Sequence, residues 1–85
     1  MSWKWEYAFG AEQTARTAPA EFLTHVEKKA EELVRAAEAM HLHGRAHAGI
    51  DPSGGDIIVP GGMFRYQIVV RSERVYVVQI TYLGF

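Results

Sequence analysis

The chain has 85 residues, 48% of them hydrophobic, and carries nine Lys or Arg residues against ten Asp or Glu residues. This length allows one small domain, and the hydrophobic content is typical of a globular protein rather than a disordered one. The absence of cysteine excludes disulfides, thiolate zinc sites and thiol nucleophiles. The near-zero net charge argues against nucleic acid as the main partner, because phosphate contacts favour a strongly basic protein. With no signal-peptide pattern and no apolar run near the ~18 residues of a membrane span, we expect a cytoplasmic protein.

The N-terminal part predicts a strand followed by helical segments. Residues 2–9 alternate between aromatic and other side chains, which is typical of a strand. We expect the aromatic side of this strand to be packed: Trp3, Trp5, Tyr7 and Phe9. Residues 11–18 are rich in Ala and Thr, and they predict either a short helix on the surface or a turn. Pro19 then suits the first turn of a following helix, and Glu21 suits its positive end.

A single long helix is predicted from Ala20 to about Leu42, because apolar side chains recur at steps of three or four residues. These side chains form one stripe: Phe22, Val26, Ala30, Leu33, Ala37 and Met40. Residues 43–56 predict a glycine-rich loop. Residues 56–60 predict a short strand at or near a sheet edge, because Pro60 cannot donate to a neighbouring strand. A turn at Gly61 and Gly62 leads into the last third of the chain.

The last third predicts two long strands joined by the polar turn 71–74. Apolar or aromatic residues occupy every second position of each strand. In the first strand they are Phe64, Tyr66, Ile68 and Val70, and in the second Tyr76, Val78, Ile80 and Tyr82. If both sets face the helices, the pairing needs an odd-length loop or a bulge near Ser72 and Glu73. The predicted fold class is α+β: a single domain over residues 1–85 with order β-α(-α)-β-β-β. Its four-stranded antiparallel or mixed sheet has helices packed on one face.

The opposite face of this sheet is predicted to be half polar, with Arg65 near its centre. Its expected members are Lys4, Glu6, Arg65, Gln67, Val69, Val77, Gln79, Thr81 and Leu83. Arg65 is the strongest functional candidate, because a planar guanidinium binds a phosphate or a carboxylate through paired hydrogen bonds. The structural alternative is an arginine that pairs with Glu6 or covers apolar surface with its stem.

Three histidines lie around Arg45, at the end of the long helix and in the loop after it: His41, His43 and His47. Imidazoles at this spacing can meet on a metal ion, with Asp51 as the nearby carboxylate. His43 or His47 can instead transfer a proton near neutral pH. Solvated loop histidines are the ordinary alternative. We expect no metal and no cofactor.

The chain resembles the RelE/ParE superfamily of bacterial toxins, the toxic halves of toxin–antitoxin pairs. The resemblance covers the Trp/Tyr first strand, the helical hairpin with its long second helix, and the closing strands. It is densest in residues 62–70 (GMFRYQIVV) and 74–81 (RVYVVQIT), which are similar to the family's glycine–aromatic–arginine strand and Val-rich last strand. It implies an antitoxin protein as partner. RelE-type members cut messenger RNA on the ribosome, and ParE-type members poison DNA gyrase.

The resemblance also implies roles for particular residues. Arg65 matches a catalytic position of the family and would stabilise charge growing on a phosphate. His43 or His47 would then transfer the proton, and four residues would bind the RNA or ligand: Lys4, Arg45, Gln67 and Gln79. The family's second-strand lysines have no counterpart in residues 56–60, and residues 83–85 carry no ionisable side chain. The C-terminal helix and tail tyrosine of some members are expected to be absent.

Three function hypotheses follow. The first is a RelE/ParE-like toxin-type protein neutralised by an antitoxin, acting as a translation-inhibiting ribonuclease or by binding its target. The second is a non-catalytic binding domain that kept the toxin fold and uses Val69, Val77 and Leu83 for a partner or a homodimer seam. The third is a metal-dependent enzyme or sensor built on the histidine loop.

Overall fold

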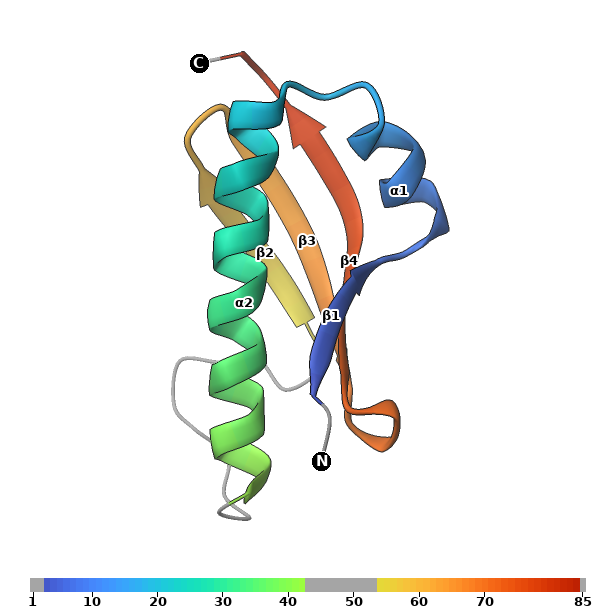
Figure 1. Cartoon of the computed structure of the whole chain (residues 1–85), viewed down its shortest axis with the longest axis vertical. Coiled ribbons are helices and arrows are strands. Elements are labelled where there is room, and N and C mark those ends of the chain that lie inside the picture. Colours follow the sequence, from blue (N-terminus) through green and yellow to red (C-terminus); the bar gives the residue numbers. More distant parts are fainter. Residues whose placement is uncertain (1–2, 43–53, 85) are drawn as a thin grey trace.

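One four-stranded sheet and two helices make up the described part of the chain, residues 3–42 and 54–84, in the computed structural model. The elements are β1 (Lys4–Tyr7), α1 (Phe9–Ala15), α2 (Ala20–Leu42), β2 (Gly54–Val59), β3 (Gly62–Val69), the 3-10 turn η1 (Val70–Ser72) and β4 (Arg74–Tyr82). The strand order is β1-β4-β3-β2, with β1 parallel to β4 and the other pairs antiparallel. Helix α2 runs along one face of the sheet, and α1 lies beside the end of β4 (Figure 1). The predicted α+β class with a mixed sheet is confirmed.

Helix α2 supplies the helical side of the core, and its bounds match the predicted ones. Every member of the apolar stripe is buried: Phe22, Val26, Ala30, Leu33, Ala37 and Met40. The stripe packs against the sheet through Phe64, Tyr66, Ile68, Val75, Val77 and Ile80. A helix with one apolar stripe needs such a sheet to cover it, and this packing provides most of its stability.

Strand β3 follows the predicted alternation. Phe64, Tyr66 and Ile68 are buried against the helices, while Arg65 and Gln67 are exposed on the other side. Val70 was expected to continue the buried set, but it begins η1 and is 45% exposed. The 3-10 turn ends the alternation, because it redirects the backbone before β4 begins.

The predicted alternation is wrong in the first half of β4. Val75 and Val77 are fully buried, whereas Tyr76 was expected in their place. The cause is a β-bulge: Arg65 pairs with Gln79 but Tyr66 pairs with Val77, so Val78 is an extra residue. An odd-length loop or a bulge near Ser72 and Glu73 was expected, but the bulge lies within β4, at Val78. Beyond the bulge, Ile80 faces the helices as predicted. Val77 was expected to be exposed and to serve a homodimer seam, but it is buried.

The N-terminal strand is shorter than predicted, and its last aromatic residue is misplaced. Trp3 is buried, but Phe9 is the first residue of α1 and is 78% exposed. Trp5 and Tyr7 are half-buried, with their rings edge to face at 5.0 Å. Trp5 Nε1 donates to Glu31 at 3.0 Å and the Tyr7 hydroxyl donates to Glu27 at 3.2 Å, so two carboxylates of α2 bind β1. Burial, and then the Glu27 carboxylate, raise the pKa of Tyr7 above its usual 10.0.

The remaining predictions concern the edge strand and the membrane. Strand β2 is an edge strand as expected, and it begins at Gly54, two residues before the predicted start. None of the helices in residues 3–42 and 54–84 is long and apolar enough to cross a bilayer.

Candidate functional site

The face of the sheet opposite the helices is the candidate site, and we call it the open face. The strand pairings place the following side chains on it: Lys4 and Glu6 from β1, Asp56 and Ile58 from β2, Met63, Arg65, Gln67 and Val69 from β3, and Arg74, Tyr76, Gln79 and Thr81 from β4. Both described helices contribute to the core on the other side. The open face carries three basic residues, Lys4, Arg65 and Arg74, and two acidic residues, Glu6 and Asp56, so its net charge is slightly positive.

Arg65 is fixed by its neighbours on both sides in the sheet. It pairs in register with Asp56 on β2 and with Gln79 on β4. Its Nε donates to Asp56 Oδ1 at 2.9 Å, and its Nη2 lies 3.5 Å from Asp56 Oδ2. The Arg65 side chain is 58% exposed. Two of its five N–H groups face Asp56, and among residues 3–42 and 54–84 no hydrogen bond uses the other three.

The Arg65–Asp56 pair shifts the titration of both groups in the direction expected for opposite charges. The hydrogen bond from Arg65 holds the pKa of Asp56 below its usual value, and the same bond raises the pKa of Arg65. Arg65 is therefore a permanent cation whose charge Asp56 partly offsets. An incoming anion competes with that carboxylate for the guanidinium.

A shallow hollow of about 160 Å³ lies beside Arg65, lined by Asp56, Met63, Phe64, Arg65, Gln79 and Thr81. Its floor is the sheet, and its rim offers a guanidinium, an amide and a hydroxyl. These groups donate hydrogen bonds to phosphate or carboxylate oxygens. The hollow is smaller than the ~300–1,000 Å³ of sites that enclose a drug-sized ligand, so it suits one group of a larger partner.

The structure brings together some of the predicted site residues and separates others. Gln79 lies directly opposite Arg65, and Gln67 follows two residues along β3 on the same face, roughly 7 Å away. Lys4 pairs with Arg74, five residues back along β4 from Gln79, which is ~15 Å along the strand. His43, Arg45 and His47 lie outside the described residues. Within residues 3–42 and 54–84, no three His, Cys, Asp or Glu side chains gather as a metal site.

Of the open-face residues that were not predicted, Asp56 and Tyr76 change the chemistry of the site most. Asp56, rather than Glu6, pairs with Arg65, while Glu6 binds Arg74 at 3.1 Å. The turn was predicted at Gly61 and Gly62, which would pair residue 58 with residue 65. The turn lies at Pro60 and Gly61 instead, and this puts residue 56 opposite residue 65. Tyr76 reaches the open face only because of the bulge at Val78, which no pattern in the sequence marked. It pairs with Gln67 and adds a phenol to this face.

The comparisons with known proteins concern the fold. No protein-family model matches the chain, and no curated protein does. Among solved structures, the chain is similar to the crystal structure of the isolated RelE toxin of E. coli. The TM-score is 0.60 at 16% sequence identity, over 99% of this chain and 87% of that chain. The fold is RelE-like. At this identity the similarity shows the fold alone.

Proposed function

We propose that this chain is a RelE/ParE-like toxin-type protein that acts on its target through the open face and is neutralised by an antitoxin protein in the cytoplasm. The observation that carries the proposal is the RelE-like fold over 99% of the chain, with Arg65 exposed on the sheet face opposite the helices. Arg65 contacts an anionic group of the target, a phosphate above all, because three of its N–H groups bond to no residue in the part of the chain that the structure describes.

Within this proposal, Arg65 is the electrostatic contact and Gln79, Gln67 and Thr81 orient the bound group. If the protein cleaves RNA, a proton must leave the attacking 2′-hydroxyl. His43 or His47 carries that proton in our proposal, with Arg45 beside them. Tyr76 is the ionisable side chain that the bulge adds to the open face. A comparison of Tyr76→Phe with His43→Ala and His47→Ala separates these proton carriers.

The experiment is inducible expression in a bacterial host, with growth, translation and replication followed after induction. Wild type arrests growth, and Arg65→Ala relieves the arrest. Loss of a hydrogen bond to a charged group costs about 1.5–3 kcal/mol, roughly tenfold or more in affinity for the target. Arg71→Ala is the matched control, because Arg71 is exposed in η1 and away from the open face. Equal toxicity of both variants contradicts a role for Arg65.

The second candidate is a non-catalytic binding domain with the same fold. It is favoured by the ion pair itself, because Asp56 already occupies part of the Arg65 guanidinium. Lys4, the other predicted basic residue of this face, lies at the β1 edge of the sheet, far from Arg65. This candidate gives no growth arrest and no RNA cleavage when the chain is expressed alone. Arrest of translation with cleaved messenger RNA decides for a ribonuclease, and arrest of replication decides for a gyrase-binding toxin.

A further inference from the structure

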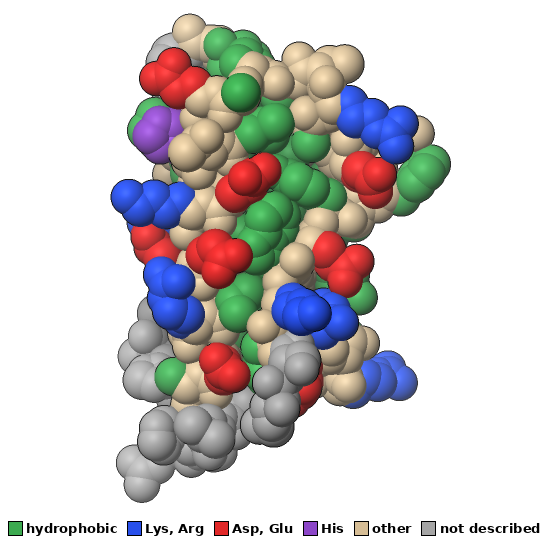
Figure 2. All heavy atoms as spheres, in the orientation of Figure 1, with side chains coloured by type: hydrophobic (Ala, Val, Ile, Leu, Met, Phe, Trp, Pro, Cys, Tyr) green, Lys and Arg blue, Asp and Glu red, His purple; other side chains and the backbone are tan. Residues whose placement is uncertain are grey.

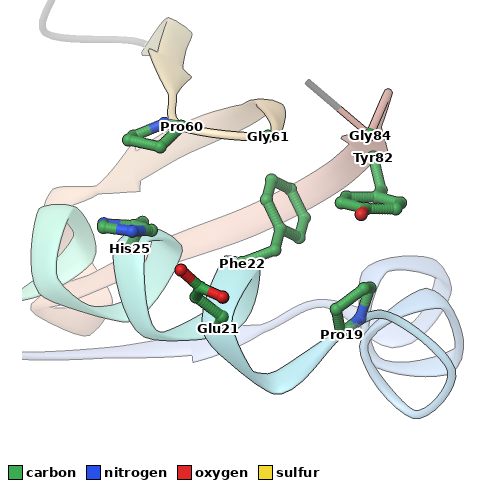
Figure 3. A pocket seen from close by; sticks show the side chains of 8 residues that line it. All are labelled: Pro19, Glu21, Phe22, His25, Pro60, Gly61, Tyr82 and Gly84. Atoms are coloured by element: carbon green, nitrogen blue, oxygen red, sulfur yellow. The ribbon is translucent and has the colours of Figure 1, made fainter.

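A second hollow lies on the helix side, away from the open face, where α2 begins. It measures about 190 Å³ and is lined by Pro19, Glu21, Phe22, His25, Pro60, Gly61, Tyr82 and Gly84. Figure 3 shows Glu21, Phe22 and His25 projecting from α2, with the Tyr82 ring opposite Phe22 and the Pro60–Gly61 turn across the hollow. The volume is below that of sites for drug-sized ligands, so it accommodates one side chain or a group of similar size.

The walls of this hollow are held by close packing. The Phe22 ring is buried, and its centre lies 5.1 Å from that of Tyr82. Gly61 has φ +97, and a Cβ there would lie 3.0 Å from Phe22, so only glycine lets the turn approach the ring this closely. The Gly61 carbonyl accepts the backbone N–H groups of Leu83 and Gly84 at 2.8 and 3.0 Å. The hollow is therefore preformed, which lowers the entropy cost of binding.

The chemistry of the lining favours an organic cation. Glu21 is the one acidic residue of the lining, and it forms no ion pair with any residue that the structure describes. Tyr82 is 47% exposed, so its aromatic ring is accessible from the hollow. A carboxylate beside an accessible aromatic ring binds ammonium and guanidinium groups by ion pairing and by cation–π attraction. The nearest lysines, Lys28 and Lys29, line an adjoining hollow instead, and Lys29 pairs with Glu32.

We propose that this hollow is a binding site for a guanidinium or alkylammonium group, with Glu21 as the counter-ion and Tyr82 as the aromatic contact. The cation comes from a basic side chain of a partner protein or from a free amine. Because none of the lining residues belongs to the open face, the test of this site is independent of the proposed function.

The test is an NMR titration of the ¹⁵N-labelled full chain with a Gly-Arg-Gly tripeptide whose ends are blocked. Amide shifts concentrate at Phe22, His25, Gly61 and Gly84. The same peptide with citrulline in place of arginine is the control, because it keeps the shape of the side chain but has no charge. Shifts of equal size with citrulline, or no shifts at these residues with arginine, overturn the proposal.

Two variants test the contacts. Glu21→Gln keeps the size of the side chain and weakens arginine-peptide binding roughly fivefold, the upper range for an exposed charge pair. Tyr82→Leu removes the ring and weakens binding roughly threefold. Glu38→Gln makes the same chemical change further along α2 and leaves binding unchanged. Equal affinities for wild type, Glu21→Gln and Tyr82→Leu overturn the proposal even if the peptide binds.

A third probe, n-butylguanidinium, distinguishes the two sources of the cation. If the blocked peptide binds severalfold more tightly than n-butylguanidinium, peptide backbone contacts contribute and the natural ligand is a basic side chain of a protein. If the two bind equally, the cation alone is recognised and a free amine is sufficient. Both results support the site, and failure of both probes to bind overturns it.

Discussion

At the residue scale, the Arg65–Asp56 pair determines how available the guanidinium is. Both side chains are exposed, so the pair adds little to the stability of the fold. In the proposed function the pair matters for binding, because Asp56 offsets the positive charge and takes up part of the guanidinium. A target phosphate gains most when it meets the N–H groups that Asp56 leaves free.

The pair can be tested through the titration of Asp56. In the wild type, the hydrogen bond from Arg65 lowers the pKa of Asp56. Arg65→Ala removes this bond, so we expect the pKa of Asp56 to rise towards its usual value. The pH dependence of the Asp56 carboxyl-carbon shift in NMR spectra measures this change. The lowered pKa gives a small stabilisation that is present above the unfolded-state pKa of Asp56. This stabilisation is lost as the pH falls through the folded-state pKa.

Arg71→Ala is the control for this titration, because Arg71 lies in η1. It leaves the titration of Asp56 unchanged. If Asp56 titrates identically in wild type and Arg65→Ala, the ion pair does not persist in solution, and the guanidinium is more accessible than the structure indicates.

At the element scale, the approach of β3 to β4 at the tight turn depends on glycine. A Cβ on Gly62 would overlap the carbonyl oxygen of Thr81 on β4, so the two strands would have to separate there. We expect Gly62→Ala to lower the free energy of unfolding by about 3 kcal/mol, within the range for strained backbone substitutions. Thermal or urea unfolding measures this change.

Gly10→Ala is the opposite case and the control. Gly10 lies in α1, and a Cβ there would meet nothing within 4 Å. Glycine inside a helix costs roughly 0.5–1 kcal/mol relative to alanine, so this variant is expected to stabilise the protein slightly. If Gly62→Ala unfolds at the same urea concentration as wild type, β3 and β4 are not as closely apposed at the turn as described.

The elements also show which parts of the fold the sequence determines. The stripe of α2 and the alternation of β3 were predicted, because each contains a regular spacing of apolar and polar side chains. The bulge in β4 was not predicted, because Val75, Val77 and Val78 are all apolar and give no sign of an extra residue. Tyr76 therefore lies on the open face and not on the packed face where it was predicted. Phe9 was misassigned because the alternation of aromatic and other side chains continues across the junction of β1 and α1.

At the scale of the whole molecule, the two faces differ in character. Figure 2 views the helix side, where acidic side chains lie along a band of hydrophobic atoms, with Lys and Arg side chains towards its edges. Glu27 and Glu31 belong to this side, because they accept hydrogen bonds from Tyr7 and Trp5. The open face instead holds Arg65 and Arg74. Our two proposals therefore use separate surfaces: a cation beside Glu21 on the helix side, and an anionic target on the open face.

The small charge excess of the open face limits its binding to RNA. The open face has three basic residues (Lys4, Arg65 and Arg74) and two acidic ones (Glu6 and Asp56), which leaves about one uncompensated positive charge. For single-stranded nucleic acid, each phosphate that a protein neutralises contributes about −0.7 to the slope of log binding constant against log salt concentration. We therefore expect a fourfold rise in salt to weaken binding of a short RNA roughly threefold, measured by fluorescence anisotropy. Asp56→Asn frees Arg65 and strengthens binding, while Arg65→Ala makes the slope shallower by ~0.7. A loss of affinity far above tenfold over the same salt range would show that cations outside the open face dominate, and the proposed role of Arg65 as the main phosphate contact would then be wrong.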